Sequence, residues 1–447
     1  MSHYKPYPVY KDSGVEWLGR VPEHWQIKRL KHIASVQTGM AKGKDHEGKD
    51  TIEVPYLRVA NVQDGYLSLD DVATMEIPRE ELARYSLQPG DVLMNEGGDF
   101  DKLGRGSVWQ GEIEPCIHQN HVFAVRPFAV SPAWLNAYTG SLTAQFYFMG
   151  RAKQSTNLAS ISSSSIMELP IVVPPEAEID LLLSRLDRET TRIDALIEKK
   201  TRFIELLREK RQALITHAVT KGLDPNVKMK DSGVEWLGEV PEHWELKPLK
   251  LLVKQGTTIS YGIVQPGEAL DDGIPFVQTT NMSSGDFDIN SLQKTTKEIA
   301  ASFPRTCLSG GEVILGIRAS IGAAFVVPAH LAGANLSRGV ARIDTSQELS
   351  SSFLVAYLSS SVVDSYWQLA KQGSTFNEVS IATVKELPIP VPPCEEQVDI
   401  ESVLNVSTGR FDALLSKTEN SIALLKERRS ALITAAVTGQ IDLREAI

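Results

Sequence analysis

The sequence predicts an α+β protein: two copies of one mixed α/β domain, joined by two long helices that form an antiparallel coiled coil with pseudo-twofold symmetry. Three observations carry this prediction. One segment occurs twice almost unchanged, short strand-like runs fill each copy, and a heptad-like apolar pattern follows each copy. The length of 447 residues suits two domains of roughly 150 to 200 residues plus connecting structure.

The two halves of the chain open in nearly the same way. Residues 11–31 read KDSGVEWLGRVPEHWQIKRLK and residues 230–250 read KDSGVEWLGEVPEHWELKPLK, with 17 of 21 positions identical at an offset of 219 residues. The match weakens in the middle of each half and returns at the ELPI segments, 168–171 and 386–389. Matching ends predict a shared structural frame. The diverged middles indicate either loops that bind different ligands or loops that have simply drifted.

Each copy alternates short β-branched or aromatic runs with turn residues, which predicts strands and loops. Examples are residues 56–62, 92–95 and 121–125. A helical stretch is predicted at 132–151, and its counterpart is 351–370. The globular part of each copy is therefore expected to be mixed α and β.

A regular spacing of apolar residues by three and four follows the Pro-Pro pair that ends each copy. It predicts a heptad seam on two long helices, with Gly222 and Gly439 as left-handed caps and Glu189, Lys200 and Lys210 as polar interruptions. Each helix needs a partner and follows its own domain, so we expect antiparallel pairing. The predicted seam residues are Ile179, Leu182, Leu186, Ile193, Leu196, Phe203, Leu207 and Leu214, with Ile400, Leu404, Phe411, Leu414, Leu425 and Leu432 in the second helix.

This pattern divides the chain into five parts. The predicted parts are a first mixed domain at 1–175, a first helix at 176–222, a second mixed domain at 223–393, a second helix at 394–439 and a tail at 440–447. The content of 42% hydrophobic and 23% charged residues is typical of a globular protein with real cores.

Composition also limits location and metal chemistry. No apolar run approaches the roughly 18 to 20 residues of a membrane span, and residues 1–10 lack an apolar signal core, so we expect a cytoplasmic protein with no membrane partner. Cys116, Cys307 and Cys394 lie far apart and form no CxxC pair, which disfavours disulfides and zinc knuckles.

The charge balance is acidic, with a net charge of -10 and a pI near 5.5. This balance argues mildly against a nonspecific nucleic-acid binder, because such proteins usually carry a broad basic surface. Net charge is an average, however. A basic face can coexist with acidic helices that contact proteins.

Three motifs resemble those of Type I restriction-modification specificity subunits: the GVEWLGxVPEHW openings at 14–25 and 233–244, the ELPIxVPP junctions, and the ALITxAVTG-like helix ends. The resemblance covers essentially the whole chain. It implies two target-recognition domains, each reading one half of a bipartite, asymmetric site in double-stranded DNA. It also implies two modification (methyltransferase) subunits and restriction/translocase subunits as partners.

The resemblance further implies that this chain is not an enzyme and binds no cofactor. S-adenosylmethionine, ATP and Mg are then expected in the partner subunits. The first seam runs from 179 to 219, which is 41 residues or about 60 Å, the length of very roughly 18 base pairs. The helices are therefore expected to set the distance between half-sites.

Motifs for catalysis are missing from the sequence. A methyltransferase would need a glycine-rich cofactor loop after a strand and a DPPY or NPPF motif, and neither is present. The nearest look-alikes, at 173–176 and 391–394, are predicted strand-to-helix junctions. Two alternatives remain: an autonomous DNA-modifying enzyme, and a coiled-coil adaptor that binds no DNA.

Metal sites are also disfavoured. Residues 96–101 contain acidic side chains that could hold a metal, but a turn is the better interpretation because the second half has no acidic counterpart. Cys116, His118 and His121 suit zinc chemically, yet the repeat offers Asn335 and Arg338 in that region. We therefore predict no catalytic residue and no metal ligand.

Residues that read bases are expected where the halves differ, as Arg or Lys toward guanine and Asn or Gln toward adenine. The repeated Trp17, Trp25, Trp236 and Trp244 are instead expected to pack the frame. The predicted DNA-contacting residues are Lys42, Lys44, Arg58, Asn61, Lys102, Arg105, Gln119 and Asn120 in the first domain, and Tyr261, Gln278, Thr280, Asn281, Arg318, Asn335 and Arg338 in the second. The repeated pairs Lys153-Gln154 and Lys371-Gln372 are predicted to contact phosphates.

Overall fold

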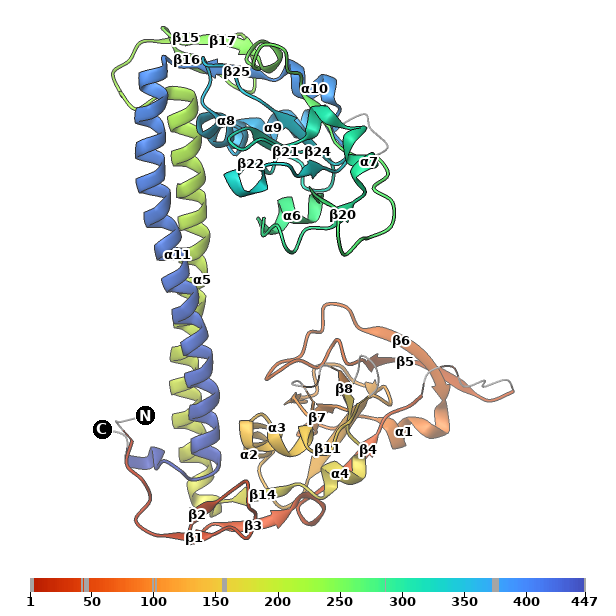
Figure 1. The fold of residues 1–447 in the computed structure, drawn as a ribbon. Helices are drawn as coiled ribbons and strands as arrows, with labels where there is room; N and C mark the ends of the chain where they lie inside the picture. Colours follow the sequence, from red (N-terminus) through yellow and green to blue (C-terminus); the bar gives the residue numbers. More distant parts are fainter. Residues whose placement is uncertain are drawn as a thin grey trace. The chain divides into compact units, whose positions relative to one another are not determined.

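The computed structural model describes residues 4–41, 43, 48–98, 100, 103–154, 159–285, 287–371 and 378–445, without the side chains of residues 371 and 445. The chain packs into two units. Unit 1 combines residues 1–201 with 420–447, and unit 2 comprises residues 202–419. Each unit thus contains one mixed α/β domain and a part of each long helix (Figure 1). Within the described residues, no helix has both the length and the apolar character needed to cross a bilayer.

The domain of unit 1 is organised around an antiparallel sheet with the strand order β4-β11-β7-β9. These strands are β4 (Ala34–Thr38), β11 (Val122–Pro127), β7 (Val92–Asn95) and β9 (Gly106–Val108). A second sheet has the order β10-β5-β6, in which β10 and β5 are parallel. Its strands are β10 (Ile117–His118), β5 (Thr51–Leu57) and β6 (Ala73–Pro78).

Smaller sheets complete unit 1. The pairs are β1 (Tyr10–Asp12) with β2 (Arg20–Pro22), and β3 (Gln26–Arg29) with β14 (Pro170–Val173). A three-stranded sheet contains β12 (Lys153–Gln154), β13 (Ala159–Ser160) and β8 (Gly97–Gly98). The short helices are α1 (Leu82–Tyr85), α2 (Pro132–Thr139), α3 (Leu142–Met149) and α4 (Ser163–Met167).

Unit 2 repeats this topology, with the order β18-β24-β21-β22 in its antiparallel sheet and β20-β19-β23 in its second sheet. The strands are β18 (Ser260–Tyr261), β24 (Val340–Ile343), β21 (Val313–Gly316), β22 (Ala324–Val326), β20 (Lys294–Thr295), β19 (Ile274–Val277) and β23 (Asn335–Leu336). The pairs are β15 (Met229–Asp231) with β16 (Glu239–Pro241), and β17 (Glu245–Pro248) with β25 (Pro388–Val391). The diverged middles of the two halves therefore fold alike.

The short helices of unit 2 are α6 (Thr279–Ser284), α7 (Lys297–Ala301), α8 (Ser351–Leu358), α9 (Ser361–Lys371) and α10 (Ile381–Glu386). The stretch predicted as one helix at 132–151 is two helices, α2 and α3, and its counterpart is α8 and α9. The first break occurs because Ser141 has an extended backbone and its side chain accepts a hydrogen bond from Ala144 N, which starts a new helix.

The long helices α5 (Glu176–Lys221) and α11 (Cys394–Val437) pair antiparallel. In unit 2, Arg208 Nη2 lies 3.2 Å from Glu419 Oε1 and Arg211 Nε lies 3.1 Å from Asp412 Oδ1, so residue numbers rise on α5 as they fall on α11. In unit 1, Arg429 of α11 binds Asp194 of α5 at 2.8 Å. The predicted fold class is confirmed.

Both helices end in a glycine cap, as expected. Gly222 has a φ of 72° and Gly439 a φ of 71°, in the left-handed region that costs glycine little. The first part of α5 and the last part of α11 enter the core of unit 1, where Leu182 and Leu432 pack with Trp25. The long helices are therefore part of the domain cores and not separate rods.

Most residues of the predicted seam are buried or half-buried. The buried ones are Ile179, Leu182, Leu186, Ile193, Leu207, Ile400, Leu404 and Leu432. Leu214, Phe411 and Leu425 are half-buried. Three predicted seam residues are wrong, because Leu196, Phe203 and Leu414 are 41%, 45% and 44% exposed.

The error in the first helix comes from a shift of phase. Leu182, Leu186 and Thr190 are all buried, so two spacings of four follow each other where a strict heptad alternates four with three. After this step Ile204 is buried instead of Phe203. In the second helix, Leu415 is half-buried beside the exposed Leu414, and Thr418 is buried one heptad after Phe411. A buried threonine is compatible with the helix core because Thr418 Oγ1 donates to the Leu414 carbonyl.

Candidate nucleic-acid interface

A tryptophan fixes the base of each domain to the start of a long helix. Trp25 Nε1 donates to Glu178 Oε2 at 3.2 Å, and Trp244 Nε1 donates to Glu396 Oε2 at 3.0 Å. Both indoles are fully buried. The expectation that repeated tryptophans pack the frame is confirmed for this pair.

A second repeated contact joins a helix of each domain to its last strand. Tyr138 Oη donates to the Pro170 carbonyl at 2.8 Å, and Tyr357 Oη donates to the Pro388 carbonyl at 2.8 Å. Burial raises the pKa of both phenols, so both remain neutral donors. These bonds hold α2 on β14 in unit 1 and α8 on β25 in unit 2.

A third repeated contact attaches each domain to the opposite long helix. Leu142 N donates to Thr434 Oγ1 on α11 at 2.9 Å, and Ser361 N donates to Thr216 Oγ1 on α5 at 3.0 Å. This contact is therefore made with α11 in unit 1 and with α5 in unit 2. These three frame contacts are the same in both units down to single hydrogen bonds, whereas the loops differ.

Three chain segments meet at one edge of each domain, which we call the three-segment corner. In unit 1, Glu96 N donates to the His121 carbonyl and Ile161 N donates to the Glu96 carbonyl. In unit 2 the same pattern links Ile317 N to the Gly339 carbonyl and Val379 N to the Ile317 carbonyl. The corner is formed by residues 95–98, 118–121 and 159–161 in unit 1, and by 316–319, 337–339 and 378–379 in unit 2.

The side chains at the corner differ completely between the units. In unit 1, His121 Nδ1 lies 2.8 Å from Glu96 Oε2, and Asn120 directly precedes His121 in the chain. Unit 2 has two arginines and one glutamate instead, described below. Of these residues, sequence contrast predicted Asn120, Arg318 and Arg338. It did not include Glu96, His121 or Glu378, because these residues meet at the corner only through pairing between distant segments.

Most of the other predicted DNA-contacting residues lie at least partly at the surface. Arg58 binds Asp71 at 2.9 Å and Arg105 binds Asp64 at 3.6 Å, with about a third of each arginine side chain exposed. These ion pairs hold the arginines in defined positions. The remaining half-exposed or exposed members are Gln119, Lys153, Gln154, Tyr261, Gln278 and Thr280.

Five predicted positions cannot be placed. Lys42, Lys44, Lys102 and Gln372 lie outside the described residues, and so does the side chain of Lys371, whose backbone ends α9.

Two predicted asparagines support loops. Asn61 Oδ1 accepts a hydrogen bond from Arg58 N at 2.9 Å, and Asn281 Oδ1 accepts one from Gln278 N at 2.9 Å. Asn61 is only 3% exposed, and its Nδ2 donates to two further carbonyls. The prediction that Asn61 reads bases does not fit this burial. Its repetition at the position of Asn281 was the signal of a structural role.

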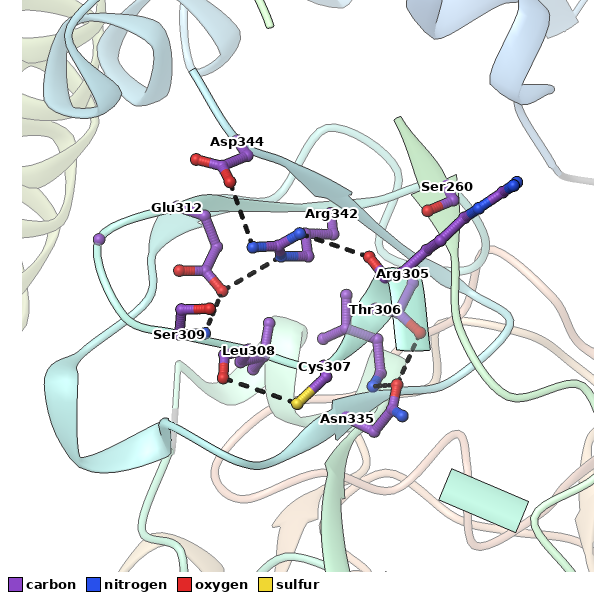
Figure 2. A network of polar contacts seen from close by, with 12 residues as sticks. Ser260, Arg305, Thr306, Cys307, Leu308, Ser309, Glu312, Asn335, Arg342 and Asp344 are labelled. Atoms are coloured by element: carbon purple, nitrogen blue, oxygen red, sulfur yellow. Dashed lines mark hydrogen bonds and ion pairs between the residues drawn. The ribbon is translucent and has the colours of Figure 1, made fainter. Parts of the chain in front are cut away.

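Asn335 is also an internal residue. It is 2% exposed, and its Oδ1 accepts from Thr306 Oγ1 at 2.6 Å and from Leu336 N at 2.8 Å (Figure 2). Its Nδ2 donates to the carbonyls of Ala300 and Phe303. Because its oxygen and its NH₂ group are engaged within the protein, the prediction that Asn335 contacts DNA is wrong.

Each main sheet buries charged groups that the sequence did not single out. In unit 2, Arg342 Nε donates to Glu312 Oε1 at 3.2 Å and its Nη2 donates to Asp344 Oδ2 at 3.3 Å, as Figure 2 shows. In unit 1, Arg126 donates two hydrogen bonds of 2.7 Å to Asp91, and these bonds raise the pKa of the guanidinium. These groups brace the sheets beneath the loops.

Exposed Arg305 is a further cation that the sequence prediction missed. Its backbone carbonyl accepts from Arg342 Nη1 at 3.4 Å, while its side chain extends away from the polar network (Figure 2). A lone arginine among diverged loop residues gives no sequence signal.

The residues considered for zinc do not form a site. Burial raises the pKa of the Cys116 thiol to about 12, and burial lowers the pKa of His118, so the first stays a thiol and the second stays neutral. His121 pairs with Glu96. Across the described part of the chain, no three His, Cys, Asp or Glu residues are gathered as metal ligands would be.

Comparisons with known proteins agree with these features. The family model described as the Type I restriction modification DNA specificity domain matches residues 241–424. The chain is 24% identical to a putative type I restriction enzyme MjaX specificity subunit of Methanocaldococcus jannaschii, over 96% of each chain. It is 22% identical to the type I restriction enzyme EcoBI specificity subunit of Escherichia coli, over 96% of this chain and 89% of that one.

Solved structures show the same fold. The HsdS subunit of Thermoanaerobacter tengcongensis is 18% identical, with a TM-score of 0.52 over 94% of this chain and 98% of that chain. A chain from work on complex assembly and conformational transition of the type I R-M system is 19% identical, with a TM-score of 0.65 over 93% of this chain and 98% of that chain.

Proposed function

The chain belongs to the family of Type I restriction-modification specificity subunits, and on that premise we propose that it reads a bipartite, asymmetric DNA site, one half with each domain. As a DNA specificity subunit it is the non-catalytic member of its complex. The observation that carries the proposal is the contrast between an identical frame and a different three-segment corner in each unit. Two copies of one scaffold with different exposed groups suit two different half-sites.

The complex requires other chains for chemistry. Two modification subunits bind this chain and carry out methylation that depends on S-adenosylmethionine. Restriction subunits bind ATP and Mg and carry out translocation. The many charged residues of α5 and α11 suit contacts with these proteins. Shared neutralisation of DNA phosphates by the partners accounts for the net charge of -10 on a DNA-reading chain.

The test is selection of DNA sites by the complex of this chain with its modification partner. A library with two randomised blocks and a variable gap is bound at several salt concentrations. We expect one preferred sequence in each block at one gap length. Mapping of methylated adenines in a host genome with and without the gene should give the same bipartite sequence. Binding without sequence preference at every salt concentration contradicts the proposal.

A further inference from the structure

Two arginines and one glutamate converge at the three-segment corner of unit 2. Arg318 Nη2 lies 2.5 Å from Glu378 Oε2, and Arg338 Nη2 lies 3.9 Å from the same oxygen. The side chains of Arg318, Arg338 and Glu378 are 37%, 46% and 29% exposed. All three are therefore accessible to a ligand while they contact one another. Two guanidinium groups and one carboxylate leave a net positive charge at this place.

The backbone that carries Arg318 has an unusual conformation. Ala319 has a φ of 58°, and Ser320 N donates to the Arg318 carbonyl at 2.6 Å, which closes a three-residue turn. Ser320 Oγ then donates to the Thr279 carbonyl at 2.8 Å and fixes the turn. A positive φ is uncommon for alanine, and such conformations persist where the surroundings impose them and cluster at functional sites.

Close packing also fixes the distance between the two arginine segments. A Cβ atom at Gly339 would lie 2.4 Å from Thr279 Cγ2 and 3.4 Å from Arg318 Cβ. Glycine therefore avoids a clash with Thr279 at this position, where the chain passes within van der Waals contact of Arg318. The residue next to it in the chain is Arg338, so this contact places both arginines at one corner.

The equivalent corner of unit 1 has the same backbone but other chemistry. The pair Gly97–Ser160 of β8 and β13 corresponds to the bridge between Arg318 and Glu378. Gly97 of unit 1 thus occupies the position of Arg318. The turn with Asn120 and His121 occupies the position of the turn with Arg338.

We propose that Arg318 and Arg338, oriented by Glu378, recognise a guanine in the half-site read by unit 2. This inference rests on the proposed function. A guanidinium has five N–H donors, and the contact with Glu378 uses one end of each, which leaves a fork suited to O6 and N7 of guanine in the major groove. Glu378 is a positioning residue, because it limits the rotation of both arginine side chains before DNA binds.

The alternative of a phosphate contact is disfavoured by the comparison between units. The DNA backbone is the same at every site, so phosphate contacts are expected to recur on a duplicated frame. Arg318, Arg338 and Glu378 do not recur. A place that keeps its backbone and changes its side chains fits the reading of a base that differs between half-sites.

The experiment compares variants in the complex with the modification partner, using the selected wild-type site and all three substitutions at each base pair. For Arg338→Ala and Arg318→Ala, we expect a loss of about 5- to 150-fold in preference at one G·C pair of one half-site. Preferences at the other half-site are expected to stay unchanged. Glu378→Gln should reduce the same preference less, while melting temperature and affinity for nonspecific DNA stay at wild-type values, and Glu378→Asp should restore part of it.

Lys250→Ala is the matched control, because Lys250 also pairs with a glutamate in unit 2, Glu386, at 2.7 Å, but belongs to the repeated frame. It should leave every base preference unchanged. If the arginine variants weaken binding equally for all sequences and lower the salt dependence, they contact phosphates and the inference is overturned. An effect confined to an A·T pair overturns it too. If wild-type protein selects no sequence at all, the proposed function itself has failed.

Discussion

Glu178 of unit 1 and Glu396 of unit 2 occupy equivalent positions but bind different numbers of partners. Both carboxylates accept from a tryptophan and contact a histidine. Glu178 alone also binds Arg444, at 2.8 Å, and it is 15% exposed compared with 26% for Glu396. The glutamate of unit 1 therefore has one more ion-pair partner than the glutamate of unit 2.

Replacement by alanine should reveal this difference. Glu178→Ala leaves a buried indole N–H without its acceptor and removes one of the two carboxylates that bind Arg444, which is expected to lower the free energy of unfolding by about 2 to 3 kcal/mol. Glu396→Ala is the matched control and should cost less, about 1 to 2 kcal/mol. Urea denaturation of both variants measures the difference. Equal losses would contradict the additional role of Arg444.

His118 should make stability depend on pH. It is fully buried, its Nδ1 lies 2.7 Å from the Val122 carbonyl, and burial lowers its pKa in the folded state from the ordinary 6.5. As pH falls below about 6.5, the unfolded chain takes up a proton that the folded chain refuses, so the free energy of unfolding should decrease. His118→Leu, which copies Leu336 of unit 2, should flatten this slope.

Denaturation curves between about pH 5 and 7 provide the measurement. His330→Leu is the matched control, because it removes an exposed imidazole instead of a buried one. A wild-type slope that persists in His118→Leu would assign the pH dependence to another group.

The long helices show how far sequence pattern determines an element. Their extent and caps follow from proline, glycine and apolar spacing. Their phase does not, because the sequence fits two patterns equally well. Leu196 and Phe203 continue a strict heptad, and Ile197 and Ile204 continue a pattern shifted by one residue. Only packing against the partner helix selects between two adjacent apolar stripes. The step at Thr190 was hidden because a polar residue occupies the inward position.

Adjacent residues on α5 allow a direct test of this phase. Ile204 is 7% exposed and Phe203 is 45% exposed. Ile204→Ala is expected to cost about 2 to 4 kcal/mol through lost burial and a cavity, whereas Phe203→Ala should cost less than about 1 kcal/mol. Chemical denaturation of the two variants decides the matter. A larger loss for Phe203→Ala would restore the strict heptad.

Loop residues were less predictable than helices, for a physical reason. The contrast between halves singled out Arg318 and Arg338, because such residues differ where the frame does not. It could not identify Glu378, which lies far along the chain and meets them only through strand pairing. It also placed Asn335 at the surface, because burial of a polar side chain depends on partners such as Thr306 that the sequence does not position.

At the scale of the whole molecule, α5 and α11 both run through the two packing units, since unit 1 ends at residue 201 within α5 and resumes at residue 420 within α11. The chain passes from one unit to the other within these two helices, after residue 201 and after residue 419. Their length should therefore set the gap between half-sites.

Insertion of one heptad into both helices tests this role. The insertions belong between Asp194 and Arg208 on α5 and between Glu419 and Arg429 on α11, so that the flanking ion pairs are kept. Seven residues add about 10 Å, and the preferred gap should grow by roughly three base pairs. An insertion in α5 alone is the control and should disrupt pairing. An unchanged gap after the double insertion would exclude the helices as the spacer.

The division of the chain also sets the order in which the two units can complete their cores during synthesis. Unit 2 is one continuous stretch, residues 202–419, but unit 1 needs its last 28 residues, 420–447, to complete a core begun by residues 1–201. The strand bridge between Lys5 and Asp442 joins the first and last described segments. During synthesis the core of unit 1 lacks the contributions of Leu432, Ala435, Ala436 and Val437 until α11 has been made. The second domain made is therefore the first that can close its core.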